Sequence, residues 1–317
     1  MRRLLKVLNN LLNLSNSMQM VSDNLKLLSN SVQMASDDLK LMNGRLMSEL
    51  IVKKHDYRSL AELEFKGFSQ FGDDGIIQYL IHNLDHKHKT FIEFGVENYM
   101  ESNTRFILQN NNWSGFIMDC SQGNINELAR SYFFWKHDLE ACCAFVTKEN
   151  INDLLKKSID KWGGVDLLHI DIDGNDYWVW EAITNILPTI VIIEYNSVFG
   201  IERAITVPYD SDFFRTNAHF SNLYWGSSLK ALYLLAKQKG YEFIGCNRAG
   251  MNAYFIRSDA MNQLVRKMSL EDGYVLSKYR ESRDKSGKLT YVSGQQRAEI
   301  IRGMPVFDIE LSRVVPF

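Results

Sequence analysis

The sequence contains few of the residues on which specialised classes of protein depend. Its 317 residues include only 4 prolines, 4 cysteines and 19 glycines, and 45% of them are hydrophobic and 12% aromatic. This composition is typical of an ordinary folded protein and excludes collagen-like, disulfide-scaffold and wholly disordered chains. The length predicts one large domain, or one domain with an appendage.

Charge and cysteine usage also exclude several kinds of partner. Lys and Arg (36) nearly balance Asp and Glu (38), so the net charge is −2 and no overall basic field favours nucleic acid. We therefore expect no nucleic-acid partner. The four cysteines show no C-x-x-C spacing and outline neither a disulfide framework nor a zinc site. This usage favours a reducing cytoplasm.

No segment reaches the roughly 18 consecutive apolar residues that a membrane-spanning helix needs. The opening MRRLLKVL resembles the charged start of a signal peptide, but asparagines soon interrupt the apolar stretch and no small-residue cleavage site follows. We therefore expect neither a signal peptide nor a transmembrane span. A peripheral contact with the inner face of a membrane stays open as an alternative.

Residues 1–50 form a region of their own, with no aromatic residue, no proline and one glycine. Apolar residues alternate there at spacings of three and four, the first series running Leu4, Leu11, Met18, Leu25, Val32, Leu39, Leu46 and the second Val7, Leu14, Val21, Leu28, Ala35, Met42. A spacing of this kind over about six heptads predicts a coiled coil. We interpret residues 1–50 as a coiled-coil oligomerisation helix.

A duplication supports this interpretation, because the segment from Asn16 to Ser29 is repeated from Asn30 to Asn43, a length of two heptads. The flanking heptad positions are mostly Ser and Asn, so charge pairing does not set the partner. A second apolar column, formed by Met20, Leu27, Met34 and Leu41, widens the face and favours a trimer or tetramer over a dimer. The alternative is a long helix folded back on its own domain.

From about residue 90 the pattern changes to short apolar runs separated by helical stretches, which is typical of a parallel sheet covered on both faces. The runs are 91–95, 115–119, 141–146, 166–171 and 189–195, followed by an expected antiparallel edge pair at 241–246 and 252–258. We divide this region into a linker and lead-in helix at 51–89, a main domain at 90–260 and a C-terminal extension at 261–317. Asp73 or Asp74 is expected to cap the lead-in helix.

Carboxylates end most of these runs, at the edge of an open α/β sheet where ligands bind. Glu93 and Gly95 follow the first run, where glycine lets a backbone approach a nucleotide and the acid accepts a ligand hydroxyl or amine. The second and third glycines of G-x-G-x-x-G are missing, so a dinucleotide site is disfavoured. Asp119 ends the second run, where an acid accepts ribose hydroxyls. These features favour a nucleoside cofactor.

Several long segments carry a family resemblance in the same order: SQFGDDGI, FIEFGVENYMESNTRF, NWSGFIMD, DLLHIDIDGNDYWVWEAI, VIIEYNSVFG, TVPYD and LYWGSSLKAL. Residues from about 68 to 317 resemble FkbM-like, class I S-adenosylmethionine-dependent methyltransferases, which are often linked to bacterial surface-glycan biosynthesis. The resemblance implies a Rossmann-like seven-stranded sheet in the order 3-2-1-4-5-7-6, with strand seven antiparallel. It also implies an S-adenosylmethionine site built from Glu93, Gly95 and Asp119, with Gln70 and Asp74 contributing.

The strongest acidic cluster is LLHIDIDGND, in which strand alternation places His169, Asp171 and Asp173 on one face. These groups are candidates for the base that deprotonates a sugar hydroxyl. They are equally candidates, as Asp171, Asp173 and Glu194, for ligands of a divalent cation such as Mg²⁺. The third alternative is that the acids only cap the next helix, through Asp173 or Asp176.

An aromatic segment follows the fifth run and is expected to bind the acceptor, since aromatic faces beside polar groups suit a saccharide. Its candidate residues are Glu194, Asn196, Tyr209, Tyr224 and Trp225. Elsewhere, His82, His86 and His88 have a spacing that suggests a metal, but an exposed turn is the simpler interpretation. We therefore expect an O-methyltransferase acting on a sugar or polysaccharide precursor. The alternative is an oligomeric scaffold with an inactive methyltransferase-like domain.

Overall fold

The computed structural model describes residues 2–317, with side chains from Asn13 onward. The chain divides into two units, residues 1–43 and 44–317. Helix α1 (Arg2–Ile51) runs through the division. The heptad side chains of Leu4, Val7 and Leu11 lie outside the described part. Where side chains are described, most of the remaining heptad residues are exposed, among them Leu25, Leu28 and Val32.

The division at residues 43 and 44 comes earlier than the boundary at residue 50 that composition suggests. The last turns of α1, from Gly44 to Ile51, belong to the second unit. A side chain at Gly44 would overlap the ring of Phe106, and Ile51 is buried. These residues pack as part of the main domain, which the sequence pattern does not reveal because the helix continues without interruption.

The second unit is built on a seven-stranded sheet in the order β3-β2-β1-β4-β5-β8-β7. Only β8 runs antiparallel to its neighbours. Because β8 and β7 take the places of strands seven and six, this is the class I methyltransferase sheet that the resemblance implies. The strands are β1 (Thr90–Phe94), β2 (Ser114–Asp119), β3 (Leu139–Cys143), β4 (Leu167–Ile170), β5 (Ile190–Glu194), β7 (Tyr241–Cys246) and β8 (Asn252–Arg257).

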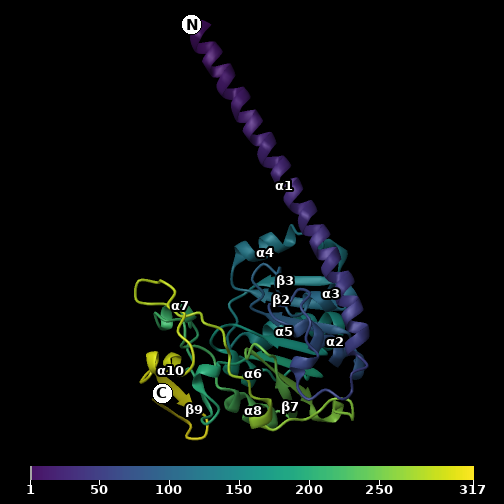
Figure 1. Cartoon of the computed structure of the whole chain (residues 1–317), viewed down its shortest axis with the longest axis vertical. Helices are drawn as coiled ribbons and strands as arrows, with labels where there is room; N and C mark the ends of the chain where they lie inside the picture. Colours follow the sequence, from purple (N-terminus) through teal and green to yellow (C-terminus); the bar gives the residue numbers. More distant parts are fainter. Residues whose placement is uncertain (1) are drawn as a thin grey trace. The chain divides into compact units, whose positions relative to one another are not determined.

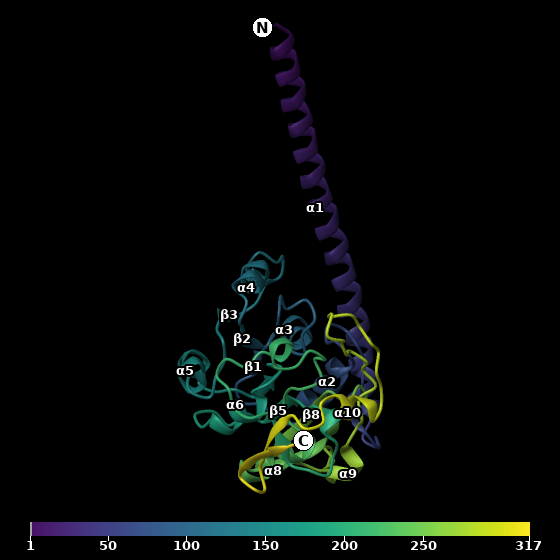
Figure 2. The ribbon, with the colours of Figure 1, turned by 90° about the vertical axis from the view of Figure 1, so that its left-hand side faces the viewer.

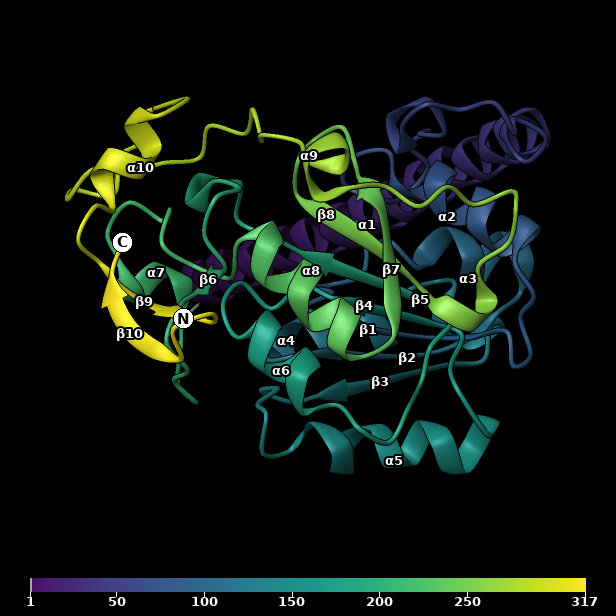
Figure 3. The ribbon, with the colours of Figure 1, turned by 90° about the horizontal axis from the view of Figure 1, so that it is seen from below.

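Helices cover both faces of this sheet, as continuous apolar strands require. The helices α5 (Ile151–Trp162), α6 (Asp176–Ala182) and α8 (Leu229–Gln238) share one core with side chains from the central strands. The helices α2 (Asp73–Asn83) and α3 (Arg105–Asn111) contact each other on the opposite face, as Figures 2 and 3 show. Helix α4 (Gln122–Ala129) connects β2 and β3.

A smaller sheet, in the order β10-β9-β6, joins the predicted C-terminal extension to the aromatic segment. Strand β6 (Ile205–Thr206) pairs with β9 (Pro305–Asp308), which forms a hairpin with β10 (Arg313–Pro316). Helix α10 (Gln296–Ile300) lies beside this sheet near α7 (Arg215–Ala218), as Figures 1 and 3 show. Short turns complete the unit: η1 (Leu60–Glu62), η2 (Phe134–Lys136), η3 (Ser197–Phe199), η4 (Ser258–Ala260) and α9 (Leu270–Gly273).

The predicted cap of the lead-in helix is wrong by one or two residues. Gly72 is the N-cap of α2, and both Asp73 and Asp74 are buried inside its first turn. Among the described residues, no helix combines the length and apolar character that crossing a membrane requires.

Candidate functional site

A cavity of about 710 Å³ opens at the carboxyl ends of β1, β2, β4 and β5. This is the edge where ligands bind in open α/β sheets. The cavity brings together eight residues that the sequence predicts for the site: Gln70, Glu93, Gly95, Asp119, His169, Asp171, Asp173 and Glu194. Five other predicted residues do not line it: Asp74, Asn196, Tyr209, Tyr224 and Trp225.

The loop after β1 forms one wall of the cavity. Gly95 has a φ of 73°, and a Cβ built on it would overlap the carbonyl oxygen of Asp171. Glu97 (φ 48°) and Tyr99 (φ 63°) also adopt the left-handed conformation. Such residues cost roughly 1–3 kcal/mol each and gather at functional sites. The loop therefore has a left-handed backbone at residues 95, 97 and 99, although only the first of them is glycine.

Asp119 at the end of β2 lies next to this loop. Its Oδ2 accepts the N–H of Glu97 at 2.8 Å, and its Oδ1 accepts the N–H of Ser121 and the side-chain amide of Asn124 at 2.8 and 3.1 Å. A carboxylate has about four lone-pair positions. Asp119 thus keeps room for one ligand hydroxyl, and a second would have to replace Asn124.

Glu93 and His169 form a buried pair on neighbouring strands. The Nδ1 atom of His169 lies 2.9 Å from Oε1 of Glu93, and Nε2 lies 3.1 Å from the side-chain amide of Asn103. Glu93 also accepts hydrogen bonds from Ser102 and Thr104. Burial raises the pKa of Glu93, but the bonds from His169 and the hydroxyls outweigh it and hold the pKa below its usual value.

This pairing leaves the two residues without a free group for a ligand. Both ring nitrogens of His169 are already engaged, and both oxygens of Glu93 accept at least two hydrogen bonds. The geometry therefore argues against His169 as a base and against Glu93 as a direct cofactor ligand. Their pairing instead fixes the ends of β1 and β4 beside the cavity.

Asp171 and Glu194 form the acidic centre of the opposite wall. The pKa of Asp171 is raised to about 7, and burial is the largest cause. A hydrogen bond with Glu194 acts in the opposite direction and lowers this pKa. Burial and the nearby Asp171 raise the pKa of Glu194 well above its usual value. Two close carboxyl groups cannot both ionise readily, so the pair shares a proton near neutral pH. Such a group can accept a proton at pH 7.

Asp173 does not continue the strand as expected, because β4 ends at Ile170 and Asp173 has a φ of 56°. Its side chain forms an ion pair of 2.7 Å with Arg215. Arg215 also binds Glu281 at 3.2 Å and donates to the carbonyl oxygen of Asn222 at 3.0 Å. No motif in the sequence points to Arg215, yet this residue ties three distant segments together at the cavity.

The capping alternative for these acids is also only partly correct. The N-cap of α6 is Asn175 rather than Asp173 or Asp176. The carboxylate of Asp176 accepts the N–H groups of Ile172 and Gly174, both at 2.9 Å, and so braces the loop that carries Asp171.

The predicted residues that lie elsewhere have structural partners. Asp74 Oδ2 accepts the N–H groups of residues 67–69 and the hydroxyl of Ser69. Asn196 caps η3 and donates to the carbonyl oxygens of Leu223 and Trp225. The hydroxyl of Tyr209 donates to the carboxylate of Glu149, and the hydroxyl of Tyr224 donates to the carbonyl oxygen of Pro305.

Trp225 is buried, with the Arg215 guanidinium 4.9 Å from its ring centre. It therefore supports Arg215 instead of contacting the cavity. The aromatic rings that do line the cavity are Phe71, Phe145, Phe213, Phe214 and Tyr279.

A metal site is not supported. No group of three or more His, Cys, Asp or Glu side chains among the described residues is placed to hold a metal ion. This holds for the set Asp171, Asp173 and Glu194, in which Asp173 is instead bound to Arg215.

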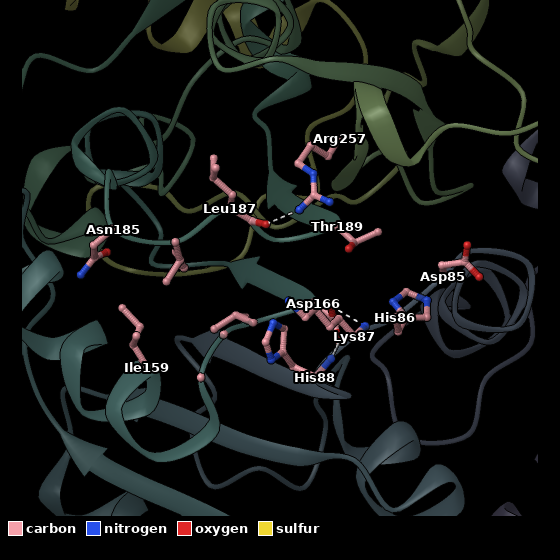
Figure 4. Close-up of a pocket in the computed structure, with 14 residues that line it drawn as sticks. Asp85, His86, Lys87, His88, Ile159, Asp166, Asn185, Leu187, Thr189 and Arg257 are labelled. Atoms are coloured by element: carbon pink, nitrogen blue, oxygen red, sulfur yellow. Dashed lines mark hydrogen bonds between the residues drawn. The ribbon is translucent and has the colours of Figure 1, made fainter.

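A second cavity, of about 480 Å³, lies at the opposite edge of the sheet, where the strands begin. The loops before β1, β4 and β5 form its wall together with Arg257 (Figure 4). Asp166 accepts the backbone N–H groups of His88 and Lys89 at 2.7 and 2.6 Å, which holds the loop before β1. Of the three histidines noted in the sequence, His86 and His88 line this cavity. None of the residues predicted for the site lies there.

Comparison with known proteins gives distant structural similarities. No family model matches the chain. No curated protein matches its sequence. Similar solved structures include an S-adenosylmethionine-dependent methyltransferase from Clostridium acetobutylicum, at 11% identity and a TM-score of 0.38 over 58% of this chain and 89% of that one. One from Aquifex aeolicus has 11% identity and a TM-score of 0.34 over 65% and 96%.

The N-terminal domain of EvdMO1 with bound S-adenosylhomocysteine has 10% identity and a TM-score of 0.33 over 67% of this chain and 94% of that one. The fold assignment rests on the strand order of the sheet rather than on these similarities.

Proposed function

We propose that the chain is an S-adenosylmethionine-dependent O-methyltransferase whose acceptor is a sugar or polysaccharide precursor. The observation that carries the proposal is the composition of the cavity at the carboxyl ends of the strands. One wall has the backbone of Gly95 and the carboxylate of Asp119, and the other has the Asp171 and Glu194 pair. A nucleoside cofactor and a hydroxyl acceptor need two such walls.

The residues on the first wall fit the cofactor. Gly95 lines the cavity, and its lack of a side chain lets the loop after β1 pack directly against the carbonyl oxygen of Asp171. Asp119 has a free position for a ribose hydroxyl, and Gln70 is an exposed amide at the rim. When bound, S-adenosylmethionine supplies a methyl group whose bond to sulfur breaks as its bond to the acceptor oxygen forms, leaving S-adenosylhomocysteine.

Asp171 is the residue we assign as base. Its pKa of about 7 leaves a substantial share of carboxylate at neutral pH, and its basicity is higher than that of an ordinary aspartate. It takes the proton of the acceptor hydroxyl and returns it to solvent after the transfer. Asp173 acts indirectly in this scheme, because its ion pair with Arg215 holds the loop in place.

A saccharide acceptor is supported by other residues that line the cavity. Phe213, Phe214 and Tyr279 provide aromatic faces there, and Asn222 and Thr216 provide polar groups. Aromatic faces contact the apolar faces of sugar rings, while hydroxyls need polar partners. Phe214 is half exposed and stacks on Phe145 with ring centres 5.9 Å apart.

The cellular setting belongs to the same proposal. The heptad pattern of residues 1–50 makes a homo-oligomer, a trimer or tetramer, the expected assembly. All four cysteines are free thiols, in keeping with a cytoplasmic location. Peripheral contact with a membrane would use the apolar side chains of α1, of which Leu27 is 65% exposed.

Calorimetry tests the proposal directly. S-adenosylmethionine should bind the wild-type chain, and Asp119→Ala should weaken binding at least about tenfold, the loss of one charge-assisted hydrogen bond. Asn124→Ala is the matched control, since it removes a hydrogen bond from Asp119 but keeps the carboxylate, and it should retain binding. Absence of binding to the wild type would favour the scaffold alternative.

A further inference from the structure

The cavity wall formed by β5, β8 and the loop after β4 contains unpaired hydrogen-bond acceptors. Glu194 Oε2, Asn252 Oδ1 and Asn175 Oδ1 are buried and have no hydrogen-bond donor among the described residues. All three residues line the cavity, and each is more than nine-tenths buried. An unpaired buried acceptor destabilises the fold, and a ligand donor would recover this loss.

Their neighbours fix the orientation of both amides. The Nδ2 of Asn252 donates to Asp73 Oδ1 at 3.0 Å, so the opposite atom of the amide must be the oxygen. The Nδ2 of Asn175 donates to the carbonyl oxygen of Asp210 at 2.8 Å with the same result. Neither amide can turn to offer a donor without losing its present bond. The bonds made by the two amide nitrogens therefore leave both amide oxygens as the acceptors at this wall.

Glu194 and Asn252 are direct neighbours, because they are paired residues in the antiparallel register of β5 and β8. Glu194 is also hydrogen-bonded to Asp171, which extends the group of acceptors toward the assigned base. A ligand group with several donors on one atom can serve such neighbouring oxygens together.

The charge of the wall points the same way. Asp171, Asp173, Glu194 and Glu281 all line the cavity. The cation among them, Arg215, is bound to Asp173, Glu281 and the carbonyl oxygen of Asn222. None of these three contacts is with the Glu194 side chain. With one proton shared between Asp171 and Glu194, the four acids still carry more negative charge than Arg215 balances, and this excess attracts a cationic ligand group.

We propose that the acceptor is an amino sugar whose ammonium group is held by Glu194 and Asn252, with Asn175 accepting from a further donor. This rests on the proposed function, which supplies the saccharide acceptor and the methyl transfer. An ammonium group has three donors and a positive charge, whereas a hydroxyl has one donor and none. The ammonium stays protonated and serves recognition, while a hydroxyl of the same sugar loses its proton to Asp171.

The test compares three probes of one ring type: glucosamine, glucose and N-acetylglucosamine. Binding of S-adenosylmethionine to the full-length chain is measured first without sugar, and sugar binding is then measured by calorimetry with S-adenosylhomocysteine present. Glucosamine should bind at least about tenfold more tightly than glucose or N-acetylglucosamine. This factor corresponds to the usual contribution of one charge-assisted hydrogen bond. Equal binding of all three, or no binding of any at millimolar concentration, would overturn the proposal.

Two isosteric variants separate this role from a structural one. Glu194→Gln should abolish the preference for glucosamine and leave cofactor affinity unchanged. Glu97→Gln removes a carboxylate from the other wall of the same cavity and should keep the preference. A Glu194→Gln chain that loses cofactor affinity would show that these oxygens serve the cofactor, which also overturns the proposal. Failure of the proposed function would differ, since the wild type would then not bind S-adenosylmethionine at all.

Discussion

Gly95 and the carbonyl oxygen of Asp171 lie in direct backbone contact, so close that a Cβ on residue 95 would overlap that oxygen. The contact joins the loop after β1 to the loop after β4, which carry the two functions assigned to the cavity. It occurs because β1 and β4 are adjacent parallel strands whose ends meet at the same edge. The contact therefore positions the proposed cofactor wall and the proposed base relative to one another.

Gly95→Ala should destabilise the fold by roughly 2–4 kcal/mol. About 1 kcal/mol comes from the left-handed backbone and the rest from overlap with Asp171. The control is Gly200→Ala, because Gly200 has nearly the same φ of 74° but nothing within 4 Å of a built Cβ. Urea unfolding of both variants gives the difference. Equal losses of unfolding free energy in the two variants would show that overlap with Asp171 adds nothing to the destabilisation by Gly95→Ala.

Much of the main domain could be predicted from the sequence because its signals are local. Five apolar runs, four of which end in or next to a carboxylate, indicated the parallel strands, and their order followed from the family resemblance. The carboxyl ends of strands then brought Asp119, Asp171 and Glu194 to one cavity. Each of these residues directly ends or follows a strand, so its place depends on the strand alone.

Several residues predicted for the site lie outside the cavity because the partners of their side chains are distant in the chain. Tyr224 bonds to the carbonyl oxygen of Pro305, and Asn196 to carbonyl oxygens near residue 223. An aromatic or amide side chain in a long segment gives no sign of whether it turns to a cavity or to such a partner. Arg215 was not predicted for the same reason, because its role at the cavity depends on ion pairs with Asp173 and Glu281, which are distant in the chain.

Folding stability should decrease as pH rises from about 4 to about 7. Asp171 has a pKa near 7 in the folded chain and an ordinary value near 3.8 when exposed, so the folded chain binds more protons in this range. Stability falls with pH wherever the folded state holds the extra proton. Asp171→Asn should reduce this decrease, measured by urea unfolding between pH 4 and pH 8.

The same variant gives a kinetic check. Turnover should increase with pH through about 7 in the wild type if Asp171 is the base, and should be lost in Asp171→Asn while cofactor affinity is kept. An unchanged pH dependence of stability would contradict the buried carboxyl pair. Full turnover in the variant would exclude Asp171 as base.

S-adenosylmethionine should protect Cys120 from alkylation. Cys120 is exposed and lines the cavity beside Asp119, whereas Cys143 is exposed but does not line it. Burial and the nearby Asp119 raise the pKa of the Cys120 thiol, so labelling with iodoacetamide is best done at alkaline pH. The two cysteines fall in different tryptic peptides, which mass spectrometry resolves. Protection of both, or of neither, would argue against a cofactor at this wall.

Charge placed on the heptad face of α1 should lower the oligomeric mass. Leu25 and Val32 are 61% and 62% exposed within one chain, and burying them against further copies is the expected source of assembly. The double variant Leu25→Glu and Val32→Glu in the full chain should therefore scatter light as a smaller species.

Gln19→Glu is the control for this experiment, because Gln19 lies off the heptad face and bonds to Asp23. It should keep the wild-type mass, and both chains should keep their affinity for S-adenosylmethionine, since the cavity is lined by residues of the second unit alone. A wild-type mass in the double variant would show that the heptad face is not what assembles the protein. The apolar residues of α1 would then need another partner, and a membrane surface would become the leading one.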